Sequence, residues 1–190
     1  MTSSTDSLRS AAAAQPENAD RRVDLGLALA AEGNLRGAAT EFEEAIRLDP
    51  ERAVAHYNLG VVYGRFLLDD LSVDEYFEDH TDEDAIFEKA SSHYKEAIRL
   101  QPNMTAALNN LARIHAAMGL GPEARGFFEQ SLAINPDQPE VTDDLVGLDA
   151  DEAPAEESWD VDEEDMEEEE EEEEEDGEEG EEEEEEENQD

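Results

Sequence analysis

Few side chains in this sequence are of the types that perform catalytic or metal chemistry. The densest group is Asp79, His80, Asp82 and Asp84, which combines carboxylate and imidazole ligands for a divalent ion. A calcium loop of the EF-hand type needs a glycine at its sharp turn and a glutamate at its twelfth position, and this segment lacks that pattern. We therefore predict a solvated acidic loop here and no metal site.

The remaining reactive residues are isolated along the chain. There is no cysteine, which excludes disulfides and thiolate metal sites. His56, His93 and His115 lie on helical patterns without matched partners, which predicts packing or surface roles. No glycine-rich phosphate loop and no grouping of nucleophile, base and acid is present. We therefore expect neither an enzyme nor a cofactor.

The charge of the chain is strongly negative and unevenly distributed. The 190 residues include 12 basic and 57 acidic side chains, for a formal net charge of −45. Residues 149–190 alone contain 30 Asp and Glu and no Lys or Arg. This segment has almost nothing to form a core, which predicts a disordered Glu-rich tail. Its Trp159 is either a candidate docking motif or an incidental aromatic residue.

The charge also limits the classes of partner. It repels phosphate backbones and anionic lipids, so we expect protein partners and neither nucleic acid nor membrane. No apolar run reaches the roughly 18–20 residues of a membrane span. The first ten residues hold no apolar signal core. A soluble cytoplasmic protein is the resulting expectation.

Helices are needed to position these side chains, and an internal repeat indicates where they lie. Three segments end alike, at Pro50, Pro102 and Pro136. The last two prolines are 34 residues apart and the first two are 52 apart, so the second copy carries an insertion of about 18 residues. Each copy reads as two amphipathic helices joined by a turn and stopped at the proline.

The order of small and large residues is also repeated. Gly26 and Gly60 are 34 residues apart, and each copy then has a small residue followed four positions later by an aromatic one, as in Ala38 and Phe42. This pattern resembles the tetratricopeptide repeat (TPR) family. The resemblance implies an all-α fold, an α-α superhelix (solenoid) of three TPR helix pairs with a capping helix, plus the disordered acidic C-terminal tail.

The domain organisation follows from these boundaries. We predict a flexible N-terminal segment over 1–18 and a TPR domain over 19–148. Within it the repeats span 19–52, 53–104 and 105–138, the acidic insertion lies near 67–84, and the cap covers 139–148. Leu71, Val73, Tyr76 and Phe77 within the insertion predict a short helix or lengthened helix ends, and Tyr76-Phe77 is a further candidate for docking.

The family resemblance also implies a binding surface, because the first helices of TPR pairs line a concave groove. Val23 and Ala106 stand where the carboxylate-clamp subfamily has Lys, and Asn110 where it has Arg, so we reject that clamp although Asn58 matches it. The asparagines could hydrogen-bond a peptide backbone or be solvated helix positions, and Tyr57 could instead pack in the core. The expected partner-binding residues are Leu27, Tyr57, Asn58, Val61, Arg65, Asn109, Asn110 and Arg113.

The function predicted from these features is that of a non-enzymatic scaffold or adaptor. It would bind a partner peptide in the groove, while the acidic tail engages basic surfaces or modulates access to the groove. The alternative is a chaperone-like buffer for basic proteins in which the tail is the active part. A third interpretation is adaptation to high salt, since the chain has 2 Lys and 10 Arg among many acids. The sequence leaves the oligomeric state open.

Overall fold

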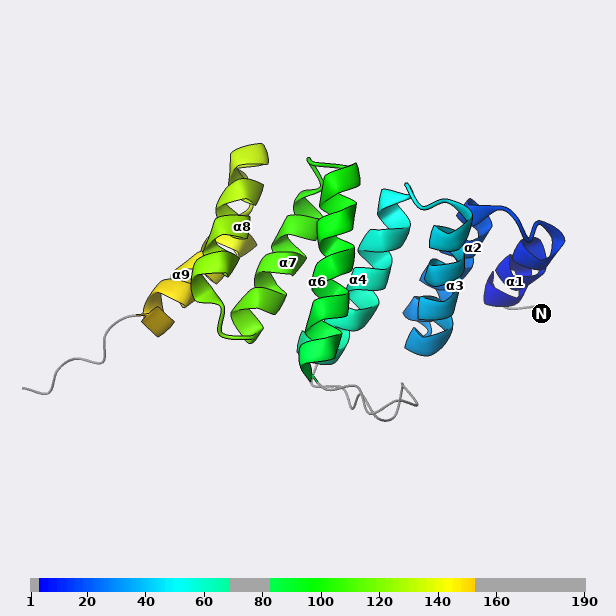
Figure 1. Ribbon diagram of the computed structural model, residues 1–190, viewed down its shortest axis with the longest axis horizontal. Helices are drawn as coiled ribbons and strands as arrows, with labels where there is room; N and C mark the ends of the chain where they lie inside the picture. Colours follow the sequence, from blue (N-terminus) through cyan, green and yellow to red (C-terminus); the bar gives the residue numbers. More distant parts are fainter. Residues whose placement is uncertain (1–3, 69–82, 153–190) are drawn as a thin grey trace, which may run out of the picture. The chain divides into compact units, whose positions relative to one another are not determined.

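The computed structural model describes residues 4–68 and 83–152, and the elements in these ranges are helices (Figure 1). No strand occurs in these two ranges, which confirms the all-α prediction. The helices, in chain order, are α1 (Ser4–Ala14), α2 (Ala19–Ala31), α3 (Leu35–Leu48), α4 (Ala53–Leu68), α6 (Glu83–Leu100), α7 (Thr105–Ala117), α8 (Gly121–Ile134) and α9 (Pro139–Glu152).

Local side-chain chemistry sets the helix ends in the first pair. The Asn18 side chain accepts a hydrogen bond from the backbone N–H of Arg21 at 3.3 Å, and Asn34 accepts one from Gly37 at 2.9 Å. These asparagines satisfy N–H groups that have no partner within the first turn of a helix. Between α2 and α3, Gly33 has a φ of +80°, a conformation that strains other residues. The turn between α2 and α3 is therefore encoded locally.

Each of the first two pairs is held by an aromatic ring against a glycine. A Cβ atom added at Gly26 would lie 2.6 Å from Phe42 Cε1, and one at Gly60 would lie 2.8 Å from Tyr94 Cδ1. Phe42 and Tyr94 are both almost fully buried. The repeated glycine therefore lets α2 approach α3, and α4 approach α6, closely enough for the ring to fill the space between them.

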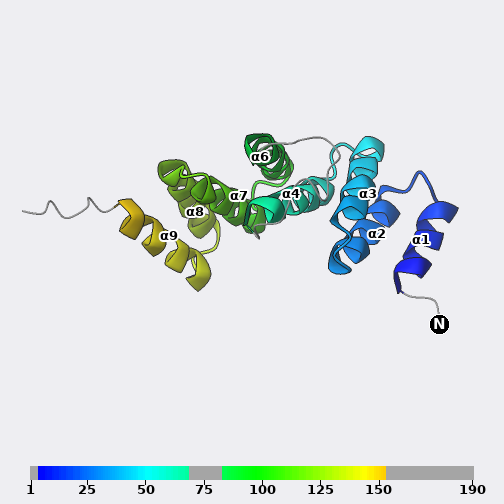
Figure 2. The same ribbon diagram turned by 90° about the horizontal axis from the view of Figure 1, so that it is seen from below.

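The helices stack in the order of the chain (Figures 1 and 2). Each helix packs on its neighbours, and the first helices of successive pairs also contact one another, α2 with α4, α4 with α7, and α7 with α9. Helix α1 packs on α2 as the second helix of a preceding pair would, and α9 packs on α7 and α8 as the first helix of a following pair would. The predicted solenoid of three helix pairs with a capping helix is confirmed.

The core is divided into two clusters of unequal size. The larger runs through α2, α3, α4 and α6 and includes Leu111 and Ile114 of α7. The smaller lies around Phe128, between α7, α8 and α9, and its other fully buried side chains are Ala112, Ala124 and Val141. The C-terminal end of the stack is therefore held by fewer apolar contacts.

The ends of the repeat domain differ from the predicted boundaries. Helix α1 stands where we expected a flexible segment over 1–18, because Ala12 is buried and the Thr5 hydroxyl donates to Glu32 at the end of α2. The cap α9 extends past the predicted end at Leu148 to Glu152. In the second pair α4 and α6 have 16 and 18 residues, longer than the 13–14 of the other paired helices, and most of the insertion lies outside the described residues.

Candidate partner-binding face

The eight residues predicted to bind a partner lie on three helices, of which α4 contacts both α2 and α7. Leu27 is on α2, four are on α4 and three are on α7. We call the surface to which they belong the α2–α4–α7 face. Its residues on α4 are Tyr57, Asn58, Val61 and Arg65, and those on α7 are Asn109, Asn110 and Arg113.

The N-terminal half of this face is apolar and open to solvent. Leu27 is 45% exposed, and Val54 in the first turn of α4 is 39% exposed. Val61 lies two helical turns after Val54 and is half-buried. Val54 was not among the predicted residues, although its spacing of seven residues from Val61 places both on one helix face. Exposed aliphatic side chains of this kind can hold an apolar side chain of a bound polypeptide.

Tyr57 packs in the core, which is one of the two roles that the sequence left open, and it also bonds to α7. Its ring is half-buried and lies 6.2 Å from the ring of Tyr94, so it packs against the core. Its hydroxyl accepts a hydrogen bond of 3.4 Å from the Asn110 amide, which links α4 to α7 across the face. The amide of Asn58 donates to the Val54 carbonyl at 2.7 Å within its own helix. Both amide nitrogens are thus engaged within the chain.

Helix α9 and the residue just before it engage two of the predicted residues on α7. Arg113 Nε lies 2.9 Å from Asp144 Oδ2, and its Nη2 lies 3.9 Å from Glu140 Oε2. The Asn109 amide donates to Gln138 Oε1 at 2.9 Å. These bonds attach α9 to α7, so Asn109 and Arg113 stabilise the cap. The sequence could not show this, because the pairing depends on where α9 packs.

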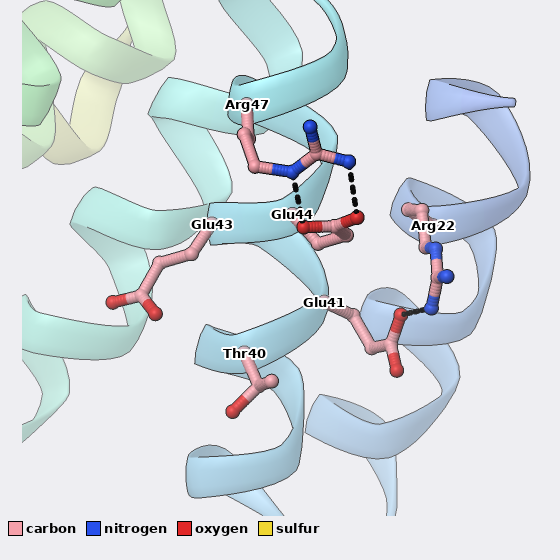
Figure 3. Close-up of a pocket in the computed structure, with 6 residues that line it drawn as sticks. All are labelled: Arg22, Thr40, Glu41, Glu43, Glu44 and Arg47. Carbon is pink, nitrogen blue, oxygen red and sulfur yellow. Dashed lines mark hydrogen bonds and ion pairs between the residues drawn. The ribbon is translucent and has the colours of Figure 1, made fainter. Parts of the chain in front are cut away.

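A separate polar cavity of about 430 Å³ lies between α2 and α3 (Figure 3). Arg22 pairs with Glu41 at 2.9 Å, and Arg47 holds both carboxylate oxygens of Glu44 at 2.8 Å. The hydrogen bonds from Arg47 lower the pKa of Glu44. Glu43 points away from both arginines, and its carboxylate accepts from the Tyr63 hydroxyl at 3.3 Å. Because these arginines are already paired with carboxylates, the cavity has no evident use in anion binding.

Two histidines predicted to lack partners contact each other. His56 Nδ1 of α4 lies 3.3 Å from His93 Nδ1 of α6, and His56 Nε2 lies 3.1 Å from the carbonyl oxygen of Pro50. Burial and the neighbouring His56 lower the pKa of His93 from 6.5 to about 4. The burial of His56 agrees with the predicted packing role. The contact itself was not predicted, because the two histidines are 37 positions apart with the insertion between them and no short motif marks such a contact.

The third histidine has a different environment. His115 of α7 is buried between Phe87 and Phe127, each with its ring centre 5.1 Å away in an edge-on arrangement. Neither ring nitrogen of His115 has a hydrogen-bond partner. Burial lowers its pKa, so the neutral ring is favoured. This residue behaves as an aromatic core side chain with two unsatisfied polar atoms, in agreement with the packing role predicted for it.

Some predicted features lie outside the described residues. These are the aromatic pair Tyr76-Phe77, the acidic cluster apart from Asp84, and Trp159. Within residues 4–68 and 83–152, no three His, Asp or Glu side chains are grouped to hold a metal ion. None of the helices in these ranges combines the length and the apolar character needed to cross a bilayer.

Comparison with known proteins agrees with the repeat and with the packing of the helices. Residues 26–65 match a profile described as TPR repeat, and residues 87–143 match one described as tetratricopeptide repeat. Together the two matches cover about half of the chain. The chain belongs to the tetratricopeptide repeat family. The first match contains Gly26, Phe42 and Gly60, and the second contains Tyr94, which are the residues of the close helix contacts described above.

One curated relative is the type IV pilus assembly protein PilF of Pseudomonas aeruginosa. It is 27% identical to this TPR protein over 150 residues, which are 70% of this chain and 60% of PilF. The chain thus spans about three-fifths of the length of that relative. An identity at this level, over part of both proteins, supports the shared repeat architecture.

Solved TPR structures have the same fold. The first TPR of Spaghetti (RPAP3), bound to the HSP90 peptide SRMEEVD, superposes with a TM-score of 0.60 at 20% identity, covering 72% of this chain and 94% of that one. The first TPR domain of human RPAP3 gives a TM-score of 0.58 at 20% identity, covering 71% and 92%. MamA gives a TM-score of 0.62 at 19% identity, covering 76% and 74%. At these identities the likeness concerns the fold.

Proposed function

We propose that this TPR protein is a non-enzymatic scaffold that binds a segment of a partner protein on its α2–α4–α7 face. The observation that carries the proposal is the exposed apolar surface of Leu27 and Val54, which continues through Val61 on helices that contact one another. On protein surfaces, contiguous exposed apolar patches mark interaction sites, whereas single apolar side chains are common. First helices line the binding groove in this family, which supports the same surface.

The chemistry of the face favours a different peptide from the one bound by RPAP3. The structure of that protein contains a peptide that ends in Glu-Glu-Val-Asp. The positions expected to clamp a carboxylate carry no charge in this chain. Val23 is apolar and buried, the side chain of Ala106 is a methyl group, and Asn110 is neutral. We infer that the ligand is a polypeptide with an apolar side chain that contacts Leu27 and Val61. Acids outnumber bases over residues 1–148, which favours basic residues around that side chain.

The acidic C-terminal segment is the second element of the proposal. Its 30 acidic residues would attract basic protein surfaces. They would also compete with other acidic protein surfaces for the same partner. The alternative function, a chaperone or buffer for basic proteins, assigns all binding to this segment. It is favoured by the same concentration of charge. The two proposals differ in which part of the chain retains the partner.

Removal of residues 153–190 separates the two functions. Full-length and shortened chains, the latter ending at Glu152, are used to capture partners at low and at high salt, and the affinity for each partner is then measured. The scaffold proposal predicts that the shortened chain keeps its partner, with an affinity that depends less on salt. Loss of every partner on removal of the segment would favour the buffer.

A substitution with a matched control locates the binding surface. Leu27→Asp places a charge in the apolar part of the face, and Ile134→Asp places the same charge on α8 at a site of similar exposure, 44% against 45%. We expect Leu27→Asp to weaken partner binding at least about tenfold and Ile134→Asp to leave it unchanged. Equal affinities for the two variants would remove the α2–α4–α7 face as the site.

A further inference from the structure

Each end of the repeat domain carries one half of a helix pair. Helix α1 packs on α2, where the second helix of an earlier pair would lie, and the 190-residue sequence has three residues before it. Helix α9 packs on α7 and α8, where the first helix of a later pair would lie. Among the described residues, α1 therefore has no first helix and α9 has no second helix. In a stack of repeats, such unmatched end helices leave part of their packing surface uncovered.

The two unmatched helices keep the register of the complete pairs. The position 34 residues before Phe42 is Leu8 on α1. The position 34 residues after Ala112, which replaces the repeated glycine in the third pair, is Val146 on α9. Leu8 therefore occupies the position of the aromatic ring, and Val146 occupies that of the small residue against which the ring packs in the first two pairs.

Val146 is uncovered at a position that is buried in every complete pair. Its side chain is 63% exposed, whereas the matching Gly26, Gly60 and Ala112 are buried. The reason is that the second helix of each complete pair covers this position. The residue sizes also suit each other, because Val146 projects further than glycine or alanine and Leu8 is shorter than an aromatic ring.

Charge selects which helix can cover α9. Helix α9 contains six acidic residues and no basic one, so it repels a second α9. It also repels residues 153–190, which include 27 acidic residues and no basic one. Helix α1 has one acid and one base, Asp6 and Arg9, which pair at 3.0 Å, so it has no net charge. Of these three segments, only α1 approaches α9 without adding negative charge.

We propose that α9 binds α1 of a second copy of this chain, and that the two helices complete a fourth pair across the two molecules. Leu8 of the second copy lies against Val146. Ala11 of the second copy takes the position at which Ala45, Ala97 and Ser131 are fully buried in the complete pairs. The α2 helix of the second copy then follows α9 as α4 follows α2 within one chain.

The proposed contact is head to tail, which determines the kind of assembly. Each bound copy still presents one unmatched helix, so the chain of molecules grows unless its rotation closes a ring. The assembly continues the α2–α4–α7 face from one copy into the next. The contact uses the end helices alone, and it does not depend on that face binding a partner.

The first test measures association of the full chain by sedimentation, at concentrations up to the millimolar range and at several salt concentrations. Because each copy has a net charge of −45, repulsion opposes the contact, and we expect added salt to strengthen it. The particle size should increase with concentration beyond that of a dimer. A monomer under all conditions, or a dimer that grows no further, would overturn the proposal.

Two variants each block one end of the chain. Val146→Asp places a charge on α9, and Ala11→Glu places a larger, charged helix former on α1. Each should weaken association at least about tenfold, whereas the control Leu68→Asp, at a 45% exposed site on α4, should associate like the unaltered chain. An equimolar mixture of Val146→Asp and Ala11→Glu should form dimers and nothing larger, because one intact contact remains between them. Equal association of all variants, or a monomeric mixture of folded variants, would contradict the head-to-tail contact.

A cross-linking measurement decides the question if either variant fails to fold. The chain has no cysteine, so Ser4→Cys and Val146→Cys each introduce one thiol at an exposed site. A short bismaleimide should join the two variants when they are mixed, and it should leave each variant alone as a monomer. Cross-linking of Val146→Cys with itself would indicate a symmetric contact between two α9 helices. That result, or an unlinked mixture, would refute the proposal.

Discussion

The first two helix pairs and the third pair achieve the same packing by different means. In the first two, Phe42 and Tyr94 lie against glycine so closely that a methyl group would collide with the ring. In the third, Ala112 takes the place of glycine and is fully buried beside Phe128. The third pair accommodates this methyl group, so α7 and α8 need not approach as closely as the helices of the first two pairs.

The apolar core is also larger at the N-terminal end of the stack than at the C-terminal end. The larger core continues through the first two pairs into α7, whereas the C-terminal cluster is small and is supplemented by polar bonds between α7 and α9. In repeat proteins the stability is approximately the sum of the repeats and their interfaces. We therefore expect α8 and α9 to open at a lower free energy than the first two pairs, and each prediction below tests this difference.

The largest expected effect comes from removing the buried rings. Phe42→Ala should lower the free energy of unfolding by about 3–5 kcal/mol, because it leaves a cavity in the larger core. Phe128→Ala makes the same change in the smaller core, but we expect it to destabilise mainly the C-terminal helices, so that they open locally at a lower free energy. Urea denaturation measures the total and hydrogen exchange locates it. Equal loss of protection in all helices for both variants would contradict a weaker C-terminal end.

The second effect tests the close approach of the helices. Gly26→Ala should destabilise the protein by about 1–3 kcal/mol, since the added methyl group meets the Phe42 ring. At an ordinary helix position the same change would stabilise by up to about 1 kcal/mol. Ala112→Gly is the reciprocal change in the third pair, and we expect a loss of about 1 kcal/mol or more from helix propensity and lost packing. A more stable Gly26→Ala protein in thermal unfolding would show that the contact is not tight.

The third effect concerns the histidine beside the smaller core. His115→Phe should stabilise the protein by about 1 kcal/mol at pH 7, because it replaces two unsatisfied buried nitrogens by carbon. Burial lowers the pKa of His115 below its unfolded value of 6.5, so the unfolded chain takes up the proton first and stability falls as the pH drops below 6.5. The Tm advantage of the variant should therefore grow from pH 7 to pH 5. A constant difference would exclude a neutral His115 as the cause.

The smallest effect tests the polar attachment of the cap. Arg113→Gln removes the ion pair with Asp144. Because the side chains of Arg113 and Asp144 are each 35% exposed, we expect the free energy of unfolding to fall by less than about 1 kcal/mol. Hydrogen exchange should become faster in α9 and remain unchanged in α2 and α3. Arg99→Gln, which breaks a more exposed pair on α6, is the control and should not affect α9. Faster exchange throughout the chain would contradict a local role.

The parts of this structure that the sequence could predict are those that repeat. The spacing of Pro102 and Pro136 defined the unit, and the same register identified Gly26 and Phe42 as repeated positions. Helix α1 was not predicted in this way, because no complete pair includes it and its packing depends on contacts such as that of Thr5 with Glu32. The repeat register likewise gave no indication of the cap extending to Glu152.

The candidate site was predictable only in its helix positions. Leu27 and Val61 lie on α2 and α4, which contact each other. Arg113 bonds to α9 and Asn109 bonds to Gln138 just before it, and the position of this part of the chain is set by tertiary packing. The contact of His56 with His93 joins two helices separated by an insertion, and a single sequence gives no spacing rule for it.

The most direct test of the account is a hydrogen-exchange footprint of a captured partner on the full chain. Exchange is compared between the free and the bound protein at high salt, where interactions of the acidic segment are screened. The account predicts slower exchange on binding in α2, α4 and α7, centred on the peptides that contain Leu27 and Val61. Protection confined to residues 153–190, or to α3, α6 and α8, would contradict it.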